Sequence, residues 1–440
     1  MAARDWLAEL SDWLAIPSVS ADPAHEGDVL AAGEWVCAFV RRAGGDASIV
    51  RQDGRPLAVG ELAASTGDGA PTVLVYGHFD VQPPAPLELW ETPPFELTER
   101  EGALYGRGVA DDKGNLFLIL SAAAQLAAAG RLPVNVRFAC DGEEEIGGHS
   151  IVDFLAADAR GAVACLIYDG MMAAPGLPTF NVATRGLAYL HLRVRTGAGD
   201  LHSGIYGGAA LNALHVLIRM LEPVLPRDGR LPEPLRAGIA PPAEEELVAW
   251  TALPGGPAEL AGAGAQPADA RAAEEFYVRT YAEPSLDVNG IEGGSPHLIK
   301  TVLPVEAHAN LSIRLAPGQE VGEIAAALER LLRGAAPAGA EVDVTLQSSA
   351  PPGLVDPRSR AVQLALEAVE STLDVRPLLV RSGGTLPIVP ALAAKGVPTV
   401  LTGFALPDCN AHAPNERMRV EDLEAGRRAA AAILTAWARL

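Results

Sequence analysis

TVLVYGHFDVQP, residues 72–83, is the stretch of sequence that decides the fold. Its first five residues are apolar or β-branched with little alternation, which indicates a buried strand of the kind found in parallel sheets. Gly77 ends this run, and His78 and Asp80 follow at the carboxyl end of the predicted strand. In open α/β sheets that end is where ligands bind. A His with a nearby carboxylate suits a metal ligand and the group that orients it, although a lone pair of this kind fits a solvent-facing His in a capped loop equally well.

Further strands are predicted on both sides of this stretch, and each acidic cluster lies just beyond a predicted strand. Strands are predicted near residues 47–51, 57–63, 133–140 and 162–168, with helices over 5–15, 28–42 and a segment ending at 129. The order of strand, loop and helix predicts that residues 1–186 form an α/β domain with a largely parallel sheet. Because parallel strands bring their carboxyl ends to one edge, we expect the loops that follow them to share a site.

The pattern changes near Gly186. Residues 187–194 alternate, which is typical of a sheet with one exposed face, and residues 223–285 are predicted to be a long irregular segment with some helix. Residues 302–315 and 341–347 are predicted strands, and 209–221 and 321–332 predicted helices. Residues 187–353 are therefore predicted to be an inserted α+β domain. The helix-and-strand rhythm returns over 354–440, which should complete the first domain.

Composition limits the classes of partner. The chain has 440 residues, 49% of them hydrophobic, and a net charge of −21, which argues against nucleic acid and anionic membranes. No apolar stretch reaches the ~18 residues of a spanning helix. Four cysteines without CxxC spacing and an acidic N-terminus predict a soluble protein of the cytoplasm.

Each polar cluster taken alone has an ordinary explanation. Asp111 and Asp112 precede a helix and fit an N-cap, while the three glutamates at 143–145 fit a solvated charge run. Asp169 fits a turn, and His412 a surface loop. Taken together, carboxylates gathered at one sheet edge would repel each other unless a cation neutralised them. The sequence therefore predicts a metal site.

Eight segments, spread over most of the chain, resemble motifs of one protein family and occur in the same order as in that family. The sequence resembles the glutamate carboxypeptidase, carnosinase and aminoacylase family of two-metal metallopeptidases, and its 284–294 segment, PSLDVNGIEGG, is most similar to the carnosinase-type dipeptidases. The matching segments are YGHFDVQP (76–83), YGRGVADDKG (105–114), DGEEEIGG (141–148), DLHSG (200–204), IKTVLP (299–304), LSIRLAP (311–317), RSGGTLP (381–387) and NAHAPNE (410–416).

The resemblance implies a ligand set for two divalent metal ions. Asp111 would bridge them, with His78 and Asp169 on the first ion and Glu145 and His412 on the second. A mixed set of His and carboxylate ligands suits Zn²⁺ and is acceptable to Mn²⁺.

The resemblance also implies roles for neighbouring residues. Glu144 would be the general base, Asp80 would orient the first His ligand, and Glu143 would have no role in the reaction. A cis peptide bond is implied between Asp111 and Asp112.

The expected substrate contacts lie in the insert and the last third of the chain. His202 would stabilise the oxyanion and would act across the interface of a homodimer, while Arg314 would bind the substrate carboxylate through its planar fork. The other expected pocket residues are Thr301, Arg381, Gly384 and Thr385.

The resulting hypothesis is a metal-dependent exopeptidase, a dipeptidase, with a catalytic domain (1–186 and 354–440) and an inserted dimerisation or lid domain (187–353). Its substrate would be a small peptide with a free C-terminal carboxylate. The alternatives within the family are a carboxypeptidase or an N-acyl amino acid amidohydrolase. A catalytically silent binding protein is the alternative of another class.

Overall fold

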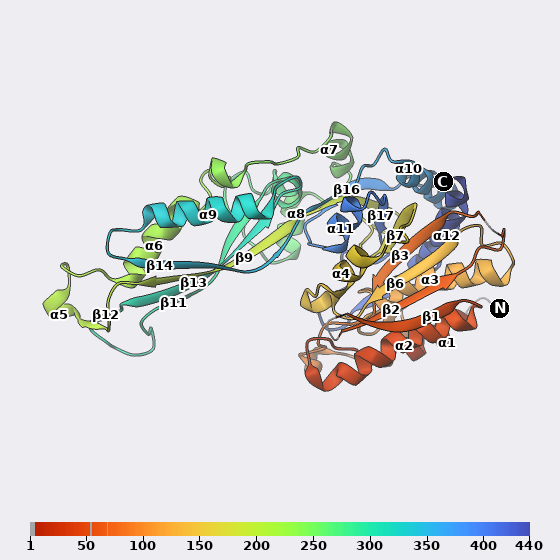
Figure 1. Ribbon diagram of the computed structural model, residues 1–440, viewed down its shortest axis with the longest axis horizontal. Helices are drawn as coiled ribbons and strands as arrows, with labels where there is room; N and C mark the ends of the chain where they lie inside the picture. Colours follow the sequence, from red (N-terminus) through yellow and green to blue (C-terminus); the bar gives the residue numbers. More distant parts are fainter. Residues whose placement is uncertain (1–4, 53–54, 68) are drawn as a thin grey trace. The chain divides into compact units, whose positions relative to one another are not determined.

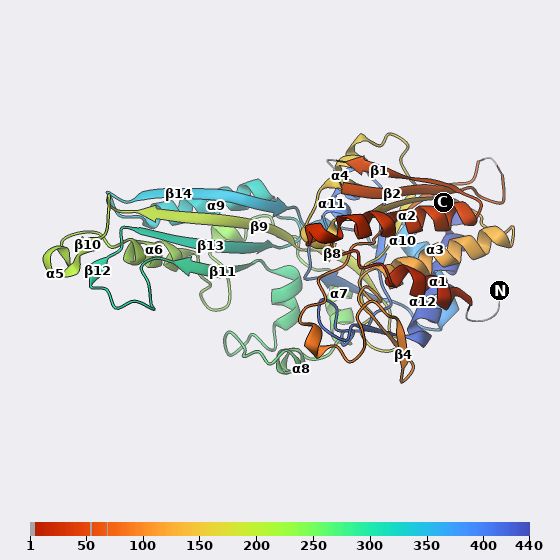
Figure 2. The same cartoon turned by 90° about the horizontal axis from the view of Figure 1, so that it is seen from below.

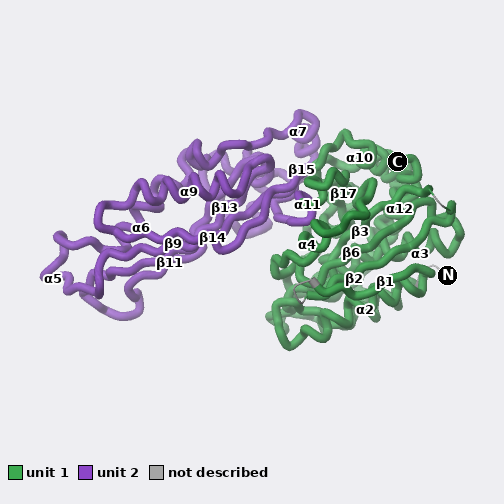
Figure 3. Tube along the Cα trace, in the orientation of Figure 1, with its two compact units in different colours: residues 1–182, 355–380, 391–440 green, residues 183–354, 381–390 purple. Residues whose placement is uncertain are grey.

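The computed structural model describes residues 5–52, 55–67 and 69–440, and the chain divides into two compact units (Figure 3). Unit 1 comprises residues 1–182, 355–380 and 391–440, and unit 2 comprises residues 183–354 and 381–390. The units change at 182/183 and 354/355, whereas the insert expected from the sequence spans 187–353. Residues 381–390, which we had expected in the catalytic domain, group with unit 2.

Unit 1 contains a six-stranded sheet in the order β1-β2-β6-β3-β7-β17 (Figure 1). β3 pairs in parallel with β6 and β7, and β7 pairs in parallel with β17, whereas β1 and β2 form an antiparallel edge. The predicted α/β fold with a mostly parallel sheet is confirmed. The strands are β1 (Asp46–Gln52), β2 (Arg55–Leu62), β3 (Thr72–His78), β6 (Asn135–Asp141), β7 (Ala164–Tyr168) and β17 (Thr399–Thr402).

Helices pack against this sheet and against one another. α3 is apolar around most of its circumference and almost entirely buried, because it lies against β3 and β7 and is covered by α12. α2 packs on β1 and β2, and α10 packs on α12. The helices are α1 (Asp5–Leu14), α2 (Glu26–Arg42), α3 (Lys113–Ala128), α4 (Ser150–Ala157), α10 (Arg360–Leu373), α11 (Ile388–Ala394) and α12 (Val420–Ala436).

Unit 2 is built on an antiparallel four-stranded sheet in the order β11-β13-β9-β14, with α6 and α9 packed on it (Figures 1 and 2). Buried and half-buried residues alternate along β9, as the sequence predicted, and also along β13. The strands are β9 (Gly186–Arg195), β11 (Ser285–Glu292), β13 (Glu306–Leu315) and β14 (Glu341–Ala350). The helices are α5 (Ser203–Tyr206), α6 (Ala213–Leu221), α7 (Glu244–Trp250), α8 (Gly256–Gly262) and α9 (Val321–Ala335).

Two details of unit 2 differ from the prediction. Residues 302–315 form two strands, β12 (Val302–Leu303) and β13, because Pro304 has no N–H to donate and interrupts the ladder. β12 pairs instead with β10 (Leu201–His202). β11 was not foreseen, since its outer half is exposed and carries no alternation of apolar residues.

The remaining strands are short or link the units covalently. β8 (Thr179–Thr184) and β16 (Leu378–Ser382) each carry the chain from unit 1 into unit 2. The others are β4 (Thr98–Arg100), β5 (Ala103–Tyr105), β15 (Gly353–Leu354) and β18 (Arg417–Arg419). Among the described residues, no helix is both long and apolar enough to cross a bilayer.

Candidate metal centre

The parallel strands of unit 1 deliver polar residues to one edge of the sheet. His78 is the last residue of β3 and pairs in register with Asp141 at the end of β6. Asp169 directly follows β7, the other neighbour of β3. These strands are almost fully buried, so the sheet fixes where their last residues lie.

Five of the candidate ligands come together in two groups that share Asp111. One group is His78, Asp111 and Asp169, and the other is Asp111, Glu145 and His412; within each, one ligand atom per residue lies within 4.8 Å of the others. The two oxygens of Asp111 face different partners, with Oδ1 3.0 Å from His78 Nε2 and Oδ2 2.9 Å from His412 Nε2. His412 Nε2 also lies 3.2 Å from Glu145 Oε2.

Asp80 connects the first His to the loop with the glutamates. Its Oδ1 is 3.4 Å from His78 Nδ1, and its two oxygens accept hydrogen bonds from the backbone N–H groups of Glu144 (3.3 Å) and Glu145 (3.1 Å). Asp80 is fully buried. It therefore holds both His78 and the turn that carries the two glutamates.

The peptide bond between Asp111 and Asp112 is cis, as the resemblance implied. Asp112 Oδ2 accepts a hydrogen bond from the backbone N–H of His78 at 3.1 Å. Asp112, the residue after Asp111, is thus hydrogen-bonded to β3, the strand that carries His78.

Burial and crowded negative charge mark this edge of the sheet. Burial raises the pKa of Glu144 to about 9; His78 opposes this shift and Asp169 adds to it. Burial likewise raises the pKa of Asp169 to about 6, with His78 opposing and Asp111 adding. Glu145 Oε1 is buried and has no hydrogen-bond partner within the described part of the chain. Carboxylates in such surroundings favour either a bound proton or a bound cation.

The sequence left two residues of this edge without a role. Gln82 Nε2 donates hydrogen bonds to Glu145 Oε2 at 2.8 Å and to its backbone oxygen at 3.3 Å. Glu143 Oε1 accepts from Ser150 N at 2.7 Å, at the start of α4. Both residues lie in motifs that were recognised, but only the fold shows what their side chains contact.

Unit 2 carries the residues predicted for substrate binding, and two of them are in contact. Arg314 Nη1 donates to Thr385 Oγ1 at 2.9 Å, and within the described ranges no carboxylate pairs with Arg314. Arg381 is buried and pairs with Glu246, Nε to Oε1 at 2.6 Å. Gly384 accepts a backbone hydrogen bond from Arg185 N through its carbonyl oxygen.

His202 and Thr301 lie in adjacent segments elsewhere in unit 2. His202 pairs with Val302 in the β10–β12 ladder, and its Nδ1 accepts from Gly204 N at 3.0 Å. Thr301 O accepts from Ser203 Oγ at 2.7 Å. His202 is exposed, so its Nε2 is free to meet another molecule.

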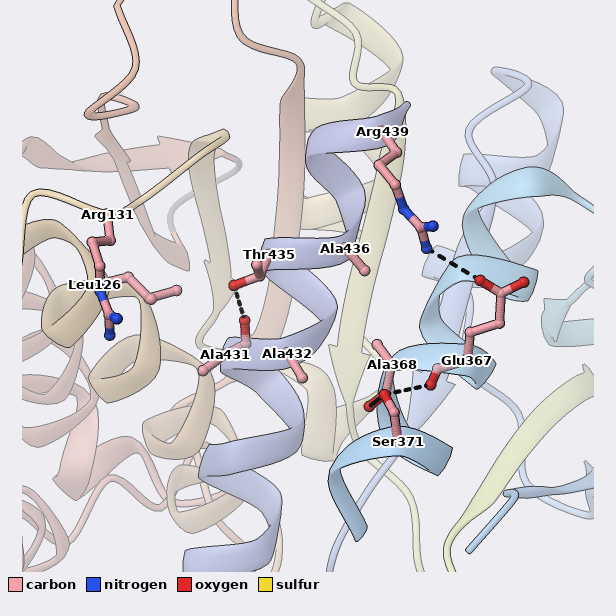
Figure 4. Close-up of a pocket in the computed structure, with 10 residues that line it drawn as sticks. All are labelled: Leu126, Arg131, Glu367, Ala368, Ser371, Ala431, Ala432, Thr435, Ala436 and Arg439. Atoms are coloured by element: carbon pink, nitrogen blue, oxygen red, sulfur yellow. Dashed lines mark hydrogen bonds and ion pairs between the residues drawn. The ribbon is translucent and has the colours of Figure 1, made fainter. Parts of the chain in front are cut away.

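A hollow of about 820 Å³ lies among α3, α10 and α12 in unit 1, and Figure 4 shows the residues that line it. Most of its polar side chains are paired within it: Arg439 pairs with Glu367, Ser371 Oγ donates to Glu367 O, and Thr435 Oγ1 donates to Ala431 O. Most of the remaining lining is alanine. We therefore assign no ligand to it.

Comparisons with known proteins agree with the site. Residues 74–436 match the family described as peptidase family M20/M25/M40. The chain is 30% identical to the cysteinylglycine-S-conjugate dipeptidase of Corynebacterium striatum over 431 residues, covering 94% of this chain and 92% of that protein. It is 27% identical to the human β-Ala-His dipeptidase, covering 82% of this chain and 74% of that protein.

Solved structures give the same result. An M20 family metallo-carboxypeptidase from Sulfolobus solfataricus superposes with a TM-score of 0.86 at 25% identity, covering 99% of this chain and all of that one. Human carnosine dipeptidase 1 superposes with a TM-score of 0.77 at 26% identity, covering 99% and 96%. The chain therefore belongs to peptidase family M20/M25/M40 and is a hydrolase of the metallopeptidase type.

Proposed function

We propose that this protein is a two-metal dipeptidase that hydrolyses the amide bond of dipeptides with a free C-terminal carboxylate. The observation that carries the proposal is the pair of ligand groups that share Asp111. The dipeptidase names of its relatives in Corynebacterium striatum and human support the substrate class.

The residues at the sheet edge fit two divalent metal ions. His78 and Asp169 with Asp111 would hold one ion, and Glu145 and His412 with Asp111 the other. Mixed nitrogen and oxygen donors suit Zn²⁺ and are accepted by Mn²⁺. The unpartnered oxygen of Glu145 and the crowded negative charge are consistent with a cation at this edge. Such a metal pair, when bound, lowers the pKa of water and polarises a carbonyl.

Glu144 is proposed as the general base. Its backbone N–H is held by Asp80, and its side chain belongs to neither ligand group, so it is available for proton transfer. Burial raises the pKa of this carboxyl and Asp169 adds to the effect, whereas a cation bound at this edge would lower it and leave the carboxylate free to accept a proton. Glu144 would accept the proton of the attacking water and deliver it to the leaving amine.

Arg314 is proposed to bind the substrate carboxylate. It has an acceptor in Thr385 but no ion-pair partner in the described portion of unit 2, so its guanidinium can still form a charge-assisted pair. Gly384 and Thr385 are proposed to line the same pocket, whereas Thr301, which lies beside His202, is proposed to reach a pocket together with it, from the partner in the homodimer. Arg381, whose guanidinium is paired with Glu246, is proposed to support the segment that carries Gly384 and Thr385.

A homodimer is proposed to complete the site. Ile205 and Tyr206 follow His202, and Leu298 and Ile299 precede Thr301; all four apolar side chains are exposed, Ile299 completely. Their segments are joined through the β10–β12 ladder at one end of unit 2 (Figure 2). An apolar surface of this kind is typical of a protein interface, and a second copy would cover it while His202 stabilises the oxyanion in the partner's site.

The proposed setting is the cytoplasm, which is supported by four buried cysteines that are all free. The net charge of −21 supports small peptides, rather than nucleic acids or anionic membranes, as partners. The proposed function has one rival with support of its own: a carboxypeptidase, the activity named for the Sulfolobus relative.

The decisive experiment is a substrate panel combined with metal analysis. Protein purified without chelator should contain two divalent ions per chain, and a chelator should abolish its activity. Dipeptides should be hydrolysed, whereas longer peptides and N-acyl amino acids should not. Sequential release of C-terminal residues from longer peptides would favour the carboxypeptidase instead. Hydrolysis that persists after complete metal removal would overturn the proposed mechanism.

A further inference from the structure

A buried ion pair connects the loops that carry the candidate ligands. Arg107 Nη1 lies 2.6 Å from Glu416 Oε2, and the two side chains are 1% and 0% exposed. Arg107 precedes Asp111 by four residues, and Glu416 follows His412 by four. The pair thus joins two ligand-bearing segments that lie about 300 residues apart in the chain.

The carboxylate of Glu416 holds the backbone of the first segment. Its Oε2 accepts from Gly108 N at 2.9 Å, and its Oε1 accepts from Ala110 N at 2.8 Å and from Asp111 N at 3.0 Å. Together with Arg107, four donors converge on one carboxylate. Charge-assisted hydrogen bonds of this kind are about twice as strong as neutral ones, so the loop that ends at Asp111 is tightly fixed.

The guanidinium of Arg107 makes a second contact with the His412 segment and extends the connection to one further loop. Its Nη2 donates to Ala413 O at 3.3 Å, next to His412, and approaches Pro83 O at 3.5 Å in the loop that follows His78. A buried ion pair by itself is weak evidence for stability. What distinguishes this one is that its remaining hydrogen bonds all go to segments that carry candidate ligands.

We propose that Glu416 is a positioning residue that fixes Asp111 and His412 relative to each other. It thereby controls affinity for the metal ion held by Asp111, Glu145 and His412. The inference rests on the proposed metal centre. It adds the expectation that Glu416 affects the affinity for one of the two ions more than for the other. Two of the three ligands in this group lie on the segments that Glu416 joins, whereas only Asp111 does so in the group with His78 and Asp169.

The test places Glu416→Gln in two backgrounds, each of which leaves one ligand group intact. Asp169→Ala retains the group with His412, and His412→Ala retains the group with Asp169. Zn²⁺ and Co²⁺ affinities are measured by calorimetric titration of chelator-treated protein. Glu416→Gln should weaken binding by about 10- to 100-fold in the Asp169→Ala background, the range typical for residues that hold a metal ligand in place, and change it little in the other.

Two results would contradict the inference: unchanged affinity in the Asp169→Ala background, or equal weakening in both. If neither background binds metal while Glu416 is intact, the proposed metal centre fails and the inference fails with it. The control is Asp158→Asn, which removes the carboxylate of the partly buried Arg137–Asp158 pair (2.9 Å) elsewhere in unit 1. It should lower thermal stability and leave both affinities unchanged.

A double variant separates positioning from stability. Glu416→Gln alone leaves the charge of Arg107 buried without a partner, which is destabilising. Arg107→Gln with Glu416→Gln removes both charges, so it should unfold closer to the parent temperature in chelator. If Glu416 positions the ligands, metal binding in the Asp169→Ala background stays weak in the double variant. Recovery of both stability and affinity would show a purely structural role.

Discussion

In unit 1 the predicted metal ligands lie around the carboxylate of Asp111, whereas in unit 2 the predicted substrate-binding residues lie in separate places. In unit 1, His78 and His412 each lie within 3.0 Å of an oxygen of Asp111. In unit 2, Arg314 contacts Thr385, while His202 is exposed in a different segment. The difference follows from the chemistry expected of each unit: metal ligands must share one ion, whereas substrate contacts need only line a surface.

The electrostatics of the two units also differ. The edge of unit 1 is crowded with buried carboxylates, and a cation would relieve their repulsion. In unit 2, Arg185 and Arg314 act on each other as like charges: burial lowers the pKa of Arg185 to about 10, and Arg314 adds to the effect. Unit 1 thus presents a site for cations, and unit 2 presents positive charge without a carboxylate on Arg314.

The largest effect is expected from Glu144→Gln in unit 1. Loss of this proposed general base should lower kcat by about 10²- to 10⁴-fold, since this is what a positioned proton acceptor contributes. Metal content should stay at two ions, because Glu144 lies outside both ligand groups. The measurements are kcat on a dipeptide and metal content of the same preparation.

Glu143→Gln and Glu145→Gln are the matched controls for that experiment. Glu143 accepts from Ser150 N, so its replacement should reduce thermal stability and leave kcat largely intact. Glu145→Gln should lose one metal ion. If Glu143→Gln rather than Glu144→Gln abolished turnover with metal retained, the assignment of the glutamate run would be wrong.

The sequence was sufficient for the parts of unit 1 that depend on topology. Once parallel strands were recognised, residues that follow them had to share one edge, and His78 and Asp169 do lie together. The contacts of Gln82, Glu143 and Glu416 were not predicted. Their side chains hold other residues of the site through hydrogen bonds, many of them to backbone groups, and such contacts leave no pattern of residue types along the chain.

Unit 2 was harder to predict because its features depend on context. The placement of residues 381–390 is set by tertiary contacts, and the sequence around RSGGTLP shows no change of pattern there. Arg381 illustrates the limit. A motif match could not distinguish a guanidinium that contacts substrate from one that is paired with Glu246 inside the unit.

Glu246→Gln is expected to lower stability in unit 2 rather than catalysis. Breaking a buried ion pair at one partner costs about 3–5 kcal/mol, because the other charge stays buried alone. The unfolding temperature should fall, while KM and kcat measured well below it should stay near the parent values. A rise in KM without loss of stability would instead show that the Arg381 segment contacts substrate directly.

Arg314→Met tests whether unit 2 recognises the substrate carboxylate. Loss of a charge-assisted pair should cost about 1.5–3 kcal/mol, or roughly 10- to 150-fold in kcat/KM. The matched measurement uses the same dipeptide with its C-terminus amidated. The parent should prefer the acid over the amide, and the variant should lose this preference. An unchanged preference would mean that the carboxylate is bound elsewhere.

Gln82→Leu, which removes a contact to a proposed metal ligand in unit 1, should have the smallest effect. Gln82 donates to Glu145 Oε2, so its loss should weaken only the ion held by Asp111, Glu145 and His412, by about 10-fold, the low end for such contacts. Gln363→Leu is the control, because it removes a 2.7 Å hydrogen bond to Pro357 O that lies away from the ligands. Metal titration compares the two variants. Equal affinities would show that the Asp111 side of this group, and not the Glu145 side, determines how firmly the ion is held.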